Sequence, residues 1–138
     1  MVGLKIDDLI VGQKALYSKT ITETDVYLFA GISGDINPAH VNNEYAKDTF
    51  FKERIAHGIL SASLISAVIG MQLPGPGTIY VSQTLKFLSP VHFGDTISAS
   101  VEVKEILKDK NRVLLNTSCK NQNNVEVLVG EAIVLPPK

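Results

Sequence analysis

The sequence predicts one α+β domain, residues 1–138, in which a curved antiparallel sheet wraps around a long central apolar helix. Residues 57–71 carry no acidic or basic side chain except one histidine, and their apolar residues lie on every side of the helical wheel. Residues 79–135 instead alternate apolar and polar side chains in several short runs, as strands with one buried face do. Because a helix without a polar face needs apolar cover on every side, we expect the sheet to bury it.

Length and composition indicate an ordinary globular protein. The 138 residues are 45% hydrophobic and 20% charged, which suits a substantial core. The formal net charge of −1, with scattered Lys and Arg, gives no electrostatic reason to expect nucleic acid or an anionic membrane surface as a partner. Cys119 is the only cysteine, which excludes an intrachain disulfide and a cysteine metal cluster. The first residues lack the basic start and apolar core of a signal peptide, so we expect a cytoplasmic protein.

A membrane span is the alternative interpretation of the apolar helix. Residues 57–71 are shorter than the roughly 20 residues that a bilayer requires. They also contain three serines and lead into Pro-Gly-Pro-Gly at residues 74–77. These features favour a buried core helix.

The first half of the chain predicts one strand followed by helices. Residues 15–21 form the strand, and Thr22 then caps a helix that ends where Ser33-Gly34 permits a left-handed turn. Residues 35–40 are expected to form an ordered loop, because proline at its fourth position disfavours helix before it. A short helix is expected over residues 43–48.

The second half predicts an antiparallel meander. The expected strands are residues 79–88, 96–107, 112–120 and 125–135, the last with a bulge at Gly130. Turn-forming residues separate them, including Asn121-Gln-Asn-Asn124.

Most motifs of known chemistry are absent from the sequence. There is no phosphate-binding glycine-rich loop, no GxGxxG, no HExxH and no GxSxG. The three histidines lie far apart and lack the spacing of metal ligands. We therefore expect neither a nucleotide cofactor nor a metal.

The segment Asp35-Ile-Asn-Pro-Ala-His40 is the first candidate for chemistry. Asp35 and His40, separated by a rigid Asn-Pro turn, can hold one water between a carboxylate and an imidazole. Such a pair can take a proton from water and return one to a substrate, as hydration of a double bond requires. The alternative is that Asp35 caps a turn and His40 is a loop residue.

The start of the apolar helix is the second candidate. Backbone N–H groups at a helix N-terminus lack helical partners and lie at the positive end of the helix dipole. Gly58 lets a ligand approach this backbone, so its N–H can stabilise an oxyanion on a thioester carbonyl. The alternative for Gly58 is tight packing, and for His57 we expect a hydrogen-bonded packing residue. Ser66 is polar on a helix expected to be buried, so it needs a backbone carbonyl or a catalytic side chain as partner.

Together these residues resemble the MaoC-like, (R)-specific enoyl-CoA hydratase family, which has the hot-dog fold. The resemblance is carried by Phe29-Ala-Gly-Ile-Ser-Gly-Asp-Ile-Asn-Pro-Ala-His40, Ala56-His-Gly-Ile-Leu60 and Phe87-Leu-Ser-Pro-Val-His-Phe-Gly-Asp95. It covers nearly the whole chain, and its first block is the most specific.

This resemblance implies reversible syn hydration of a trans-2-enoyl-CoA to an (R)-3-hydroxyacyl-CoA. Asp35 and His40 would hold the catalytic water, the Gly58 N–H would bind the thioester oxygen, and Ser66 would steady the aspartate. The family resemblance further implies a homodimer, and no cofactor beyond the coenzyme A that arrives with the substrate.

Two neighbouring enzyme classes and one non-enzymatic class remain as alternatives. Hot-dog thioesterases and acyl-carrier-protein dehydratases place a carboxylate on the central helix, whereas this sequence has no Asp or Glu between Glu53 and Asp95. A non-catalytic acyl-CoA-binding subunit would be expected to lose Asp35 and His40 first, and both are present.

Overall fold

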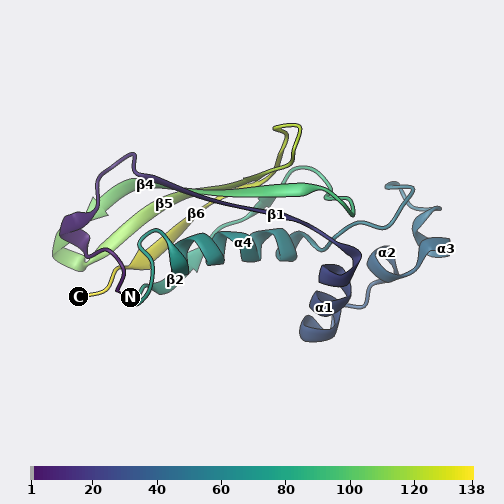
Figure 1. Cartoon of the computed structure of the whole chain (residues 1–138), viewed down its shortest axis with the longest axis horizontal. Coiled ribbons are helices and arrows are strands. Elements are labelled where there is room, and N and C mark those ends of the chain that lie inside the picture. Colours follow the sequence, from purple (N-terminus) through teal and green to yellow (C-terminus); the bar gives the residue numbers. More distant parts are fainter. Residues whose placement is uncertain (1) are drawn as a thin grey trace.

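A computed structural model of the chain describes residues 2–138 and shows one curved antiparallel sheet packed against a single long helix (Figure 1). The strands are β1 (Lys14–Thr20), β2 (Ile79–Gln83), β3 (Lys86–Phe87), β4 (Thr96–Leu107), β5 (Arg112–Lys120) and β6 (Glu126–Leu135). The helices are α1 (Glu23–Ser33), α2 (Pro38–Val41), α3 (Asn43–Ala46) and α4 (Gly58–Met71), with short 3-10 turns at Ile6–Asp8 and Lys108–Lys110. This arrangement confirms the predicted α+β class.

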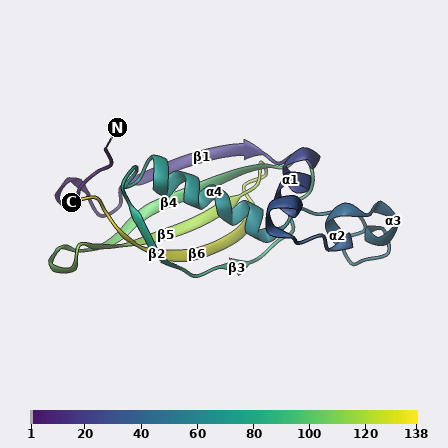
Figure 2. The same cartoon turned by 90° about the horizontal axis from the view of Figure 1, so that it is seen from below.

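The sheet order is β1-β4-β5-β6-β2, with β3 paired to β6. Figure 2 shows α4 crossing the strands, with β1 at one edge of the sheet and β2 and β3 at the other. Helices α1, α2 and α3 lie beyond the end of the sheet that is farthest from the two termini (Figure 1). From α1, the chain passes through α2 and α3 and then enters α4 at its N-terminal end.

The alternating strands form the cover that the sequence predicts for the central helix. From Ile97 to Val103 of β4 every second side chain is buried, and β5 shows the same alternation. The buried residues of these two strands are Ile97, Ala99, Val101, Val103, Val113, Leu115, Thr117 and Cys119. Helix α4 packs Leu64, Ile65, Val68 and Ile69 into the same core. Each fully buried aliphatic side chain contributes about 2 kcal/mol to folding.

The helix α4 is not buried on every side, so this part of the prediction is wrong for a single chain. Ile59 is 53% exposed and Met71 is 66% exposed, and Ser63 and Ser66 are exposed between them. The sheet curls around only one side of α4 (Figure 2). We call the exposed residues Ile59, Ser63, Ser66 and Met71 the open face of α4.

The first long helix begins and ends where the sequence predicts. The Asp25 N–H donates to Thr22 Oγ1 at 3.2 Å, and the Thr22 N–H donates back to the Asp25 carboxylate at 2.9 Å. Gly34 ends α1 with φ of 78°, the left-handed conformation that glycine adopts without strain.

The predicted strand over residues 79–88 is interrupted, and Gly130 explains the interruption. The chain between β2 and β3 passes so close to β6 that a Cβ on Gly130 would lie 1.8 Å from the Thr84 carbonyl oxygen. The predicted bulge at Gly130 is wrong, because Gly130 pairs regularly with Thr117. Its role is to permit a close approach of backbone instead.

The helices of residues 2–138 are all too short or too polar to cross a membrane.

Candidate active site

Asp35, His40 and His57 meet at the N-terminal end of α4. One oxygen of Asp35 and one nitrogen of each ring lie within 4.8 Å of one another. Asp35 comes from the connection after α1, His40 from α2, and His57 from the residue that precedes α4. The fold therefore assembles the two segments that the sequence marks as separate candidates.

A series of local hydrogen bonds fixes the segment from Asp35 to His40. The Asp35 N–H donates to Ser33 Oγ, and the Asn37 N–H donates to the Asp35 carboxylate, both at 3.1 Å. The side chain of Asn37 then caps α2 by accepting from the Ala39 N–H at 3.1 Å. His40 thus lies in a helical turn and not in the expected loop, because Pro38 at the first helical position starts a helix well.

The ring of His40 is held in one orientation. Its Nδ1 lies 2.7 Å from the carbonyl oxygen of Ile55, and because a carbonyl only accepts, Nδ1 carries the proton. In the neutral ring, Nε2 then has a free lone pair and can accept a proton from water. The residue is only 9% exposed, so burial also restrains the ring.

His57 contacts both members of the predicted pair. Its Nε2 donates to the backbone carbonyl of Asp35 at 2.8 Å, and its ring stacks on His40 with centroids 3.8 Å apart. Phe29 packs on the same ring at 4.9 Å. His57 is hydrogen-bonded and packed, as the sequence predicts, and its contacts fix the geometry of the site.

The closeness of the two histidines was not expected from their spacing, and it raises the question of a metal ion. Metal-binding rings point their in-plane lone pairs at a common centre. The rings of His40 and His57 are instead stacked at 29°, which directs their lone pairs side by side. Each ring also donates one N–H to a backbone carbonyl. This geometry suits mutual packing better than joint ligation.

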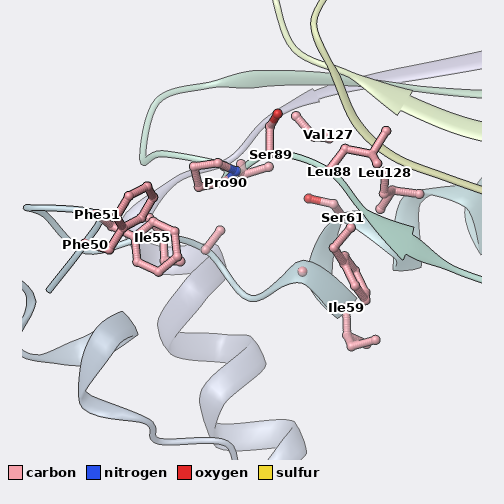
Figure 3. Close-up of a pocket in the computed structure, with 14 residues that line it drawn as sticks. Phe50, Phe51, Ile55, Ile59, Ser61, Leu88, Ser89, Pro90, Val127 and Leu128 are labelled. Carbon is pink, nitrogen blue, oxygen red and sulfur yellow. The ribbon is translucent and has the colours of Figure 1, made fainter.

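An apolar cavity of about 480 Å³ begins at the first residue of α4 (Figure 3). Its wall includes Gly58, Phe51, Phe87, Leu88 and Leu128. The N–H of Gly58 has no carbonyl partner within the helix, because it belongs to the first turn. A Cβ on this residue would lie 2.6 Å from the Phe87 side chain, so glycine permits this ring to pack tightly against the start of α4. This is the packing role given above as the alternative for Gly58, and the binding of an oxyanion by its N–H stays a prediction.

The structure does not bring Ser66 to Asp35 within one chain. Ser66 is exposed on the open face of α4 and lies eight residues after Gly58, about 12 Å along the helix axis. The supporting role of Ser66 therefore stays a prediction. Ser61 is the buried serine of α4, and sequence reasoning missed it although it lies one turn after Gly58, on the same face.

Comparisons with known proteins agree with this fold. The family described as MaoC like domain matches residues 10–126. The protein of Rhodospirillum rubrum named (R)-specific enoyl-CoA hydratase is 54% identical over 131 residues, covering 95% of this chain and 90% of that protein.

Solved structures with similar sequences have the same fold as this chain. The unliganded R-hydratase PhaJ1 from Pseudomonas aeruginosa matches with a TM-score of 0.93 and 51% identity, covering 99% of this chain and 87% of that chain. The (R)-hydratase from A. caviae involved in PHA biosynthesis matches with a TM-score of 0.91 and 43% identity, covering 94% of this chain and 98% of that chain. These matches confirm the hot-dog fold. The chain belongs to the family of MaoC-like domains.

Proposed function

We propose that this chain is an (R)-specific enoyl-CoA hydratase, which adds water reversibly to a trans-2-enoyl-CoA and forms an (R)-3-hydroxyacyl-CoA. The observation that carries the proposal is the meeting of Asp35 and His40 at the N-terminus of α4, beside an apolar cavity. The names of the relatives described above support the same reaction.

Asp35 and His40 hold the water and exchange its proton. The hydroxyl of the water bonds to C3 of the substrate, and the π electrons of the C2=C3 bond move towards the thioester oxygen. The resulting enolate returns an electron pair to C2 as that carbon takes a proton. Because the same pair of residues serves both carbons, both additions occur on one face, which gives the syn product. The two residues act as one coupled acid–base unit.

The N–H of Gly58 binds the thioester oxygen while enolate character develops. It lies at the positive end of the α4 dipole, where negative charge is stabilised. The acyl chain occupies the apolar cavity next to it. Coenzyme A arrives as part of the substrate, so the reaction needs no separate cofactor and no metal.

We also propose that the protein works as a homodimer in the cytoplasm. The open face of α4 carries Ile59 and Met71, and the edge strand β2 exposes Ile79 at 60% and Val81 at 48%. Apolar side chains beside an unpaired strand edge favour association with a second copy. Ser66 lies on the open face, so its predicted support of Asp35 requires that second copy.

The test is an assay of the purified protein with crotonyl-CoA. We expect the absorbance of the conjugated thioester to fall without release of free thiol, and a stereospecific dehydrogenase to identify the (R)-alcohol. Prior dialysis against EDTA should leave the rate unchanged. Burial raises the pKa of the Cys119 thiol to about 12, and a blank without substrate measures what this thiol contributes to the readout. Formation of the (S)-alcohol, or no reaction with short or long enoyl chains, would contradict the proposal.

The same assay distinguishes a thioesterase. Helix α4 carries no carboxylate that could activate water against the thioester carbonyl. Release of free coenzyme A at a rate matching substrate loss would nevertheless identify hydrolysis, and Asp35 and His40 would then need another role.

A further inference from the structure

We infer that the Ser61 hydroxyl is a second hydrogen-bond donor to the thioester oxygen of the substrate, acting together with the N–H of Gly58. This inference rests on the proposed function, because it assigns one more contact to the substrate in the same site. It makes Ser61 a determinant of thioester recognition, in addition to the acid–base pair.

The hydroxyl of Ser61 is buried and has no hydrogen-bond partner among residues 2–138. Ser61 is 1% exposed. Its backbone carbonyl is used, since the Cys119 thiol donates to it at 3.5 Å, whereas its side-chain oxygen is not. A buried hydroxyl without a partner destabilises the unliganded protein, so its retention needs a reason.

Helix geometry places this hydroxyl beside Gly58. Residues three apart share one face of a helix, and side chains lean towards the helix N-terminus. The Ser61 side chain therefore lies over the turn that begins at Gly58, against which the Phe87 ring also packs. Figure 3 shows the hydroxyl oxygen pointing into the cavity, towards Ser89 and Pro90 on the opposite wall.

The chemistry of the cavity identifies the atom that the hydroxyl binds. The wall around Ser61 is mostly apolar, with Ile59, Leu88 and Val127 among its members. A simple enoyl thioester is hydrocarbon apart from its sulfur and one carbonyl oxygen. That oxygen must already lie near the Gly58 N–H if the proposed function is right. A single acceptor between two donors on the same helical turn satisfies both.

The affinities of wild type and variants for two ligands that are not hydrated test the contact without requiring turnover. Butyryl-CoA keeps the thioester oxygen and cannot be hydrated, whereas S-butyl-CoA is the thioether that lacks this oxygen. In calorimetry, we expect wild-type protein to bind butyryl-CoA about tenfold more tightly than S-butyl-CoA. Ser61→Ala should lose most of this preference for the thioester. The control is Ser63→Ala, which removes an exposed hydroxyl of α4 that bonds to the Leu60 carbonyl at 2.5 Å. It should keep the wild-type preference.

Activity and stability should move in opposite directions. With crotonyl-CoA, Ser61→Ala should lower kcat/KM by about 10- to 100-fold, mainly through kcat, as loss of an oxyanion donor does. Its urea midpoint should equal or exceed that of wild type, because the unpaired hydroxyl is gone. A lower midpoint with an unchanged butyryl-CoA preference would make Ser61 a structural residue and overturn the inference.

The two proposals fail in different ways. If wild-type protein does not hydrate crotonyl-CoA but Ser61→Ala still loses the preference for the thioester, the hydratase function is wrong and the contact stands. If wild type is active and Ser61→Ala keeps both its activity and the preference, the contact is wrong and the function stands.

Discussion

At the scale of single residues, His57 links the two side chains proposed to hold the catalytic water. It donates to the Asp35 backbone carbonyl at 2.8 Å and stacks on the His40 ring at 3.8 Å. It does not need to touch the substrate to matter, because a shift of about 1 Å in a reacting group can cost two orders of magnitude in rate. We therefore regard His57 as a positioning residue.

Two substitutions separate the hydrogen bond of His57 from its stacking. His57→Phe keeps a ring beside His40 and loses the donor to Asp35, whereas His57→Gln keeps a donor near Nε2 and loses the ring. We expect each to lower kcat/KM by about 10- to 100-fold. Both losses should persist when rates are corrected for the folded fraction, and they should fall mainly on kcat. Activity losses that merely follow the folded fraction would show that His57 acts only on stability.

The sequence could predict some site residues and not others. Asp35, His40 and Gly58 stand out because glycine, proline and paired acid–base residues form recognisable local patterns. The choice between Ser61 and Ser66 could not be made, because a helix with apolar residues on every side does not show which face the sheet covers. The stacking of His40 on His57 depends on tertiary contact alone.

At the scale of elements, the capping box of α1 makes one contribution to stability depend on pH. Burial raises the pKa of Asp25, but the hydrogen bonds from Thr22 and the Lys19 ammonium at 2.9 Å outweigh it and lower the pKa. A lowered folded-state pKa gives stability that is present above the unfolded value of about 3.9 and is lost as pH falls through the folded value.

Asp25→Asn should therefore be less stable than wild type at pH 7, and the difference should shrink as the solution is acidified below about pH 4. Urea midpoints at a series of pH values measure this. Asp109→Asn, which changes an exposed carboxylate in a surface turn, is the control and should follow wild type. A difference that stays constant down to pH 2 would contradict the assignment.

The close approach of Thr84 to Gly130 of β6 gives the second prediction at this scale. In Gly130→Ala, the new methyl group would meet the Thr84 carbonyl oxygen at 1.8 Å. Both contacting groups are fixed by the backbone, so neither can rotate away as a flexible side chain could. We expect a loss of about 3 kcal/mol or more in the free energy of unfolding. Gly31→Ala in α1 has no atom within 4 Å of the added carbon and should stabilise by about 0.5–1 kcal/mol. Equal effects of the two substitutions in urea unfolding would refute this account.

The strands of the sheet show how much of the fold can be predicted from the periodicity of apolar residues. Most of β4 and all of β5 follow from alternation, because each strand lies in the middle of the sheet with one face in the core. The alternation in β4 ends at Val103, where the pairing register with β5 shifts. The alternation over residues 79–88 looks equally regular, yet the strand breaks. The break is imposed by backbone packing against Gly130, which leaves no mark on the side-chain pattern.

At the scale of the whole molecule, the open face of α4 and the β2 edge are the surfaces where we propose that a second copy binds. The sequence predicts a helix buried on all sides, and the structure of one chain buries only part of it. If the proposed dimer forms, the composition of the helix reflects contacts with a second copy, and a single sequence does not show how many chains share a core.

Light scattering after gel filtration tests the dimer. We expect about twice the chain mass of 15.0 kDa for wild type. Ile79→Lys on β2 should shift the protein towards monomer, because it places a charge at the proposed contact. Leu16→Lys is the matched control, since Leu16 is 62% exposed on the opposite edge strand β1 and should leave the dimer intact. A monomeric wild type, or equal effects of both variants, would contradict this interface.

The central claim is that Asp35 and His40 together carry out the addition of water. Its most direct test is kcat/KM with crotonyl-CoA for wild type, Asp35→Asn and Ser66→Ala, each shown to be folded by circular dichroism. We predict that Asp35→Asn loses about 10²- to 10⁴-fold, as expected for an acid–base group, and that Ser66→Ala loses much less. A folded Asp35→Asn variant with activity within about tenfold of wild type would contradict the account.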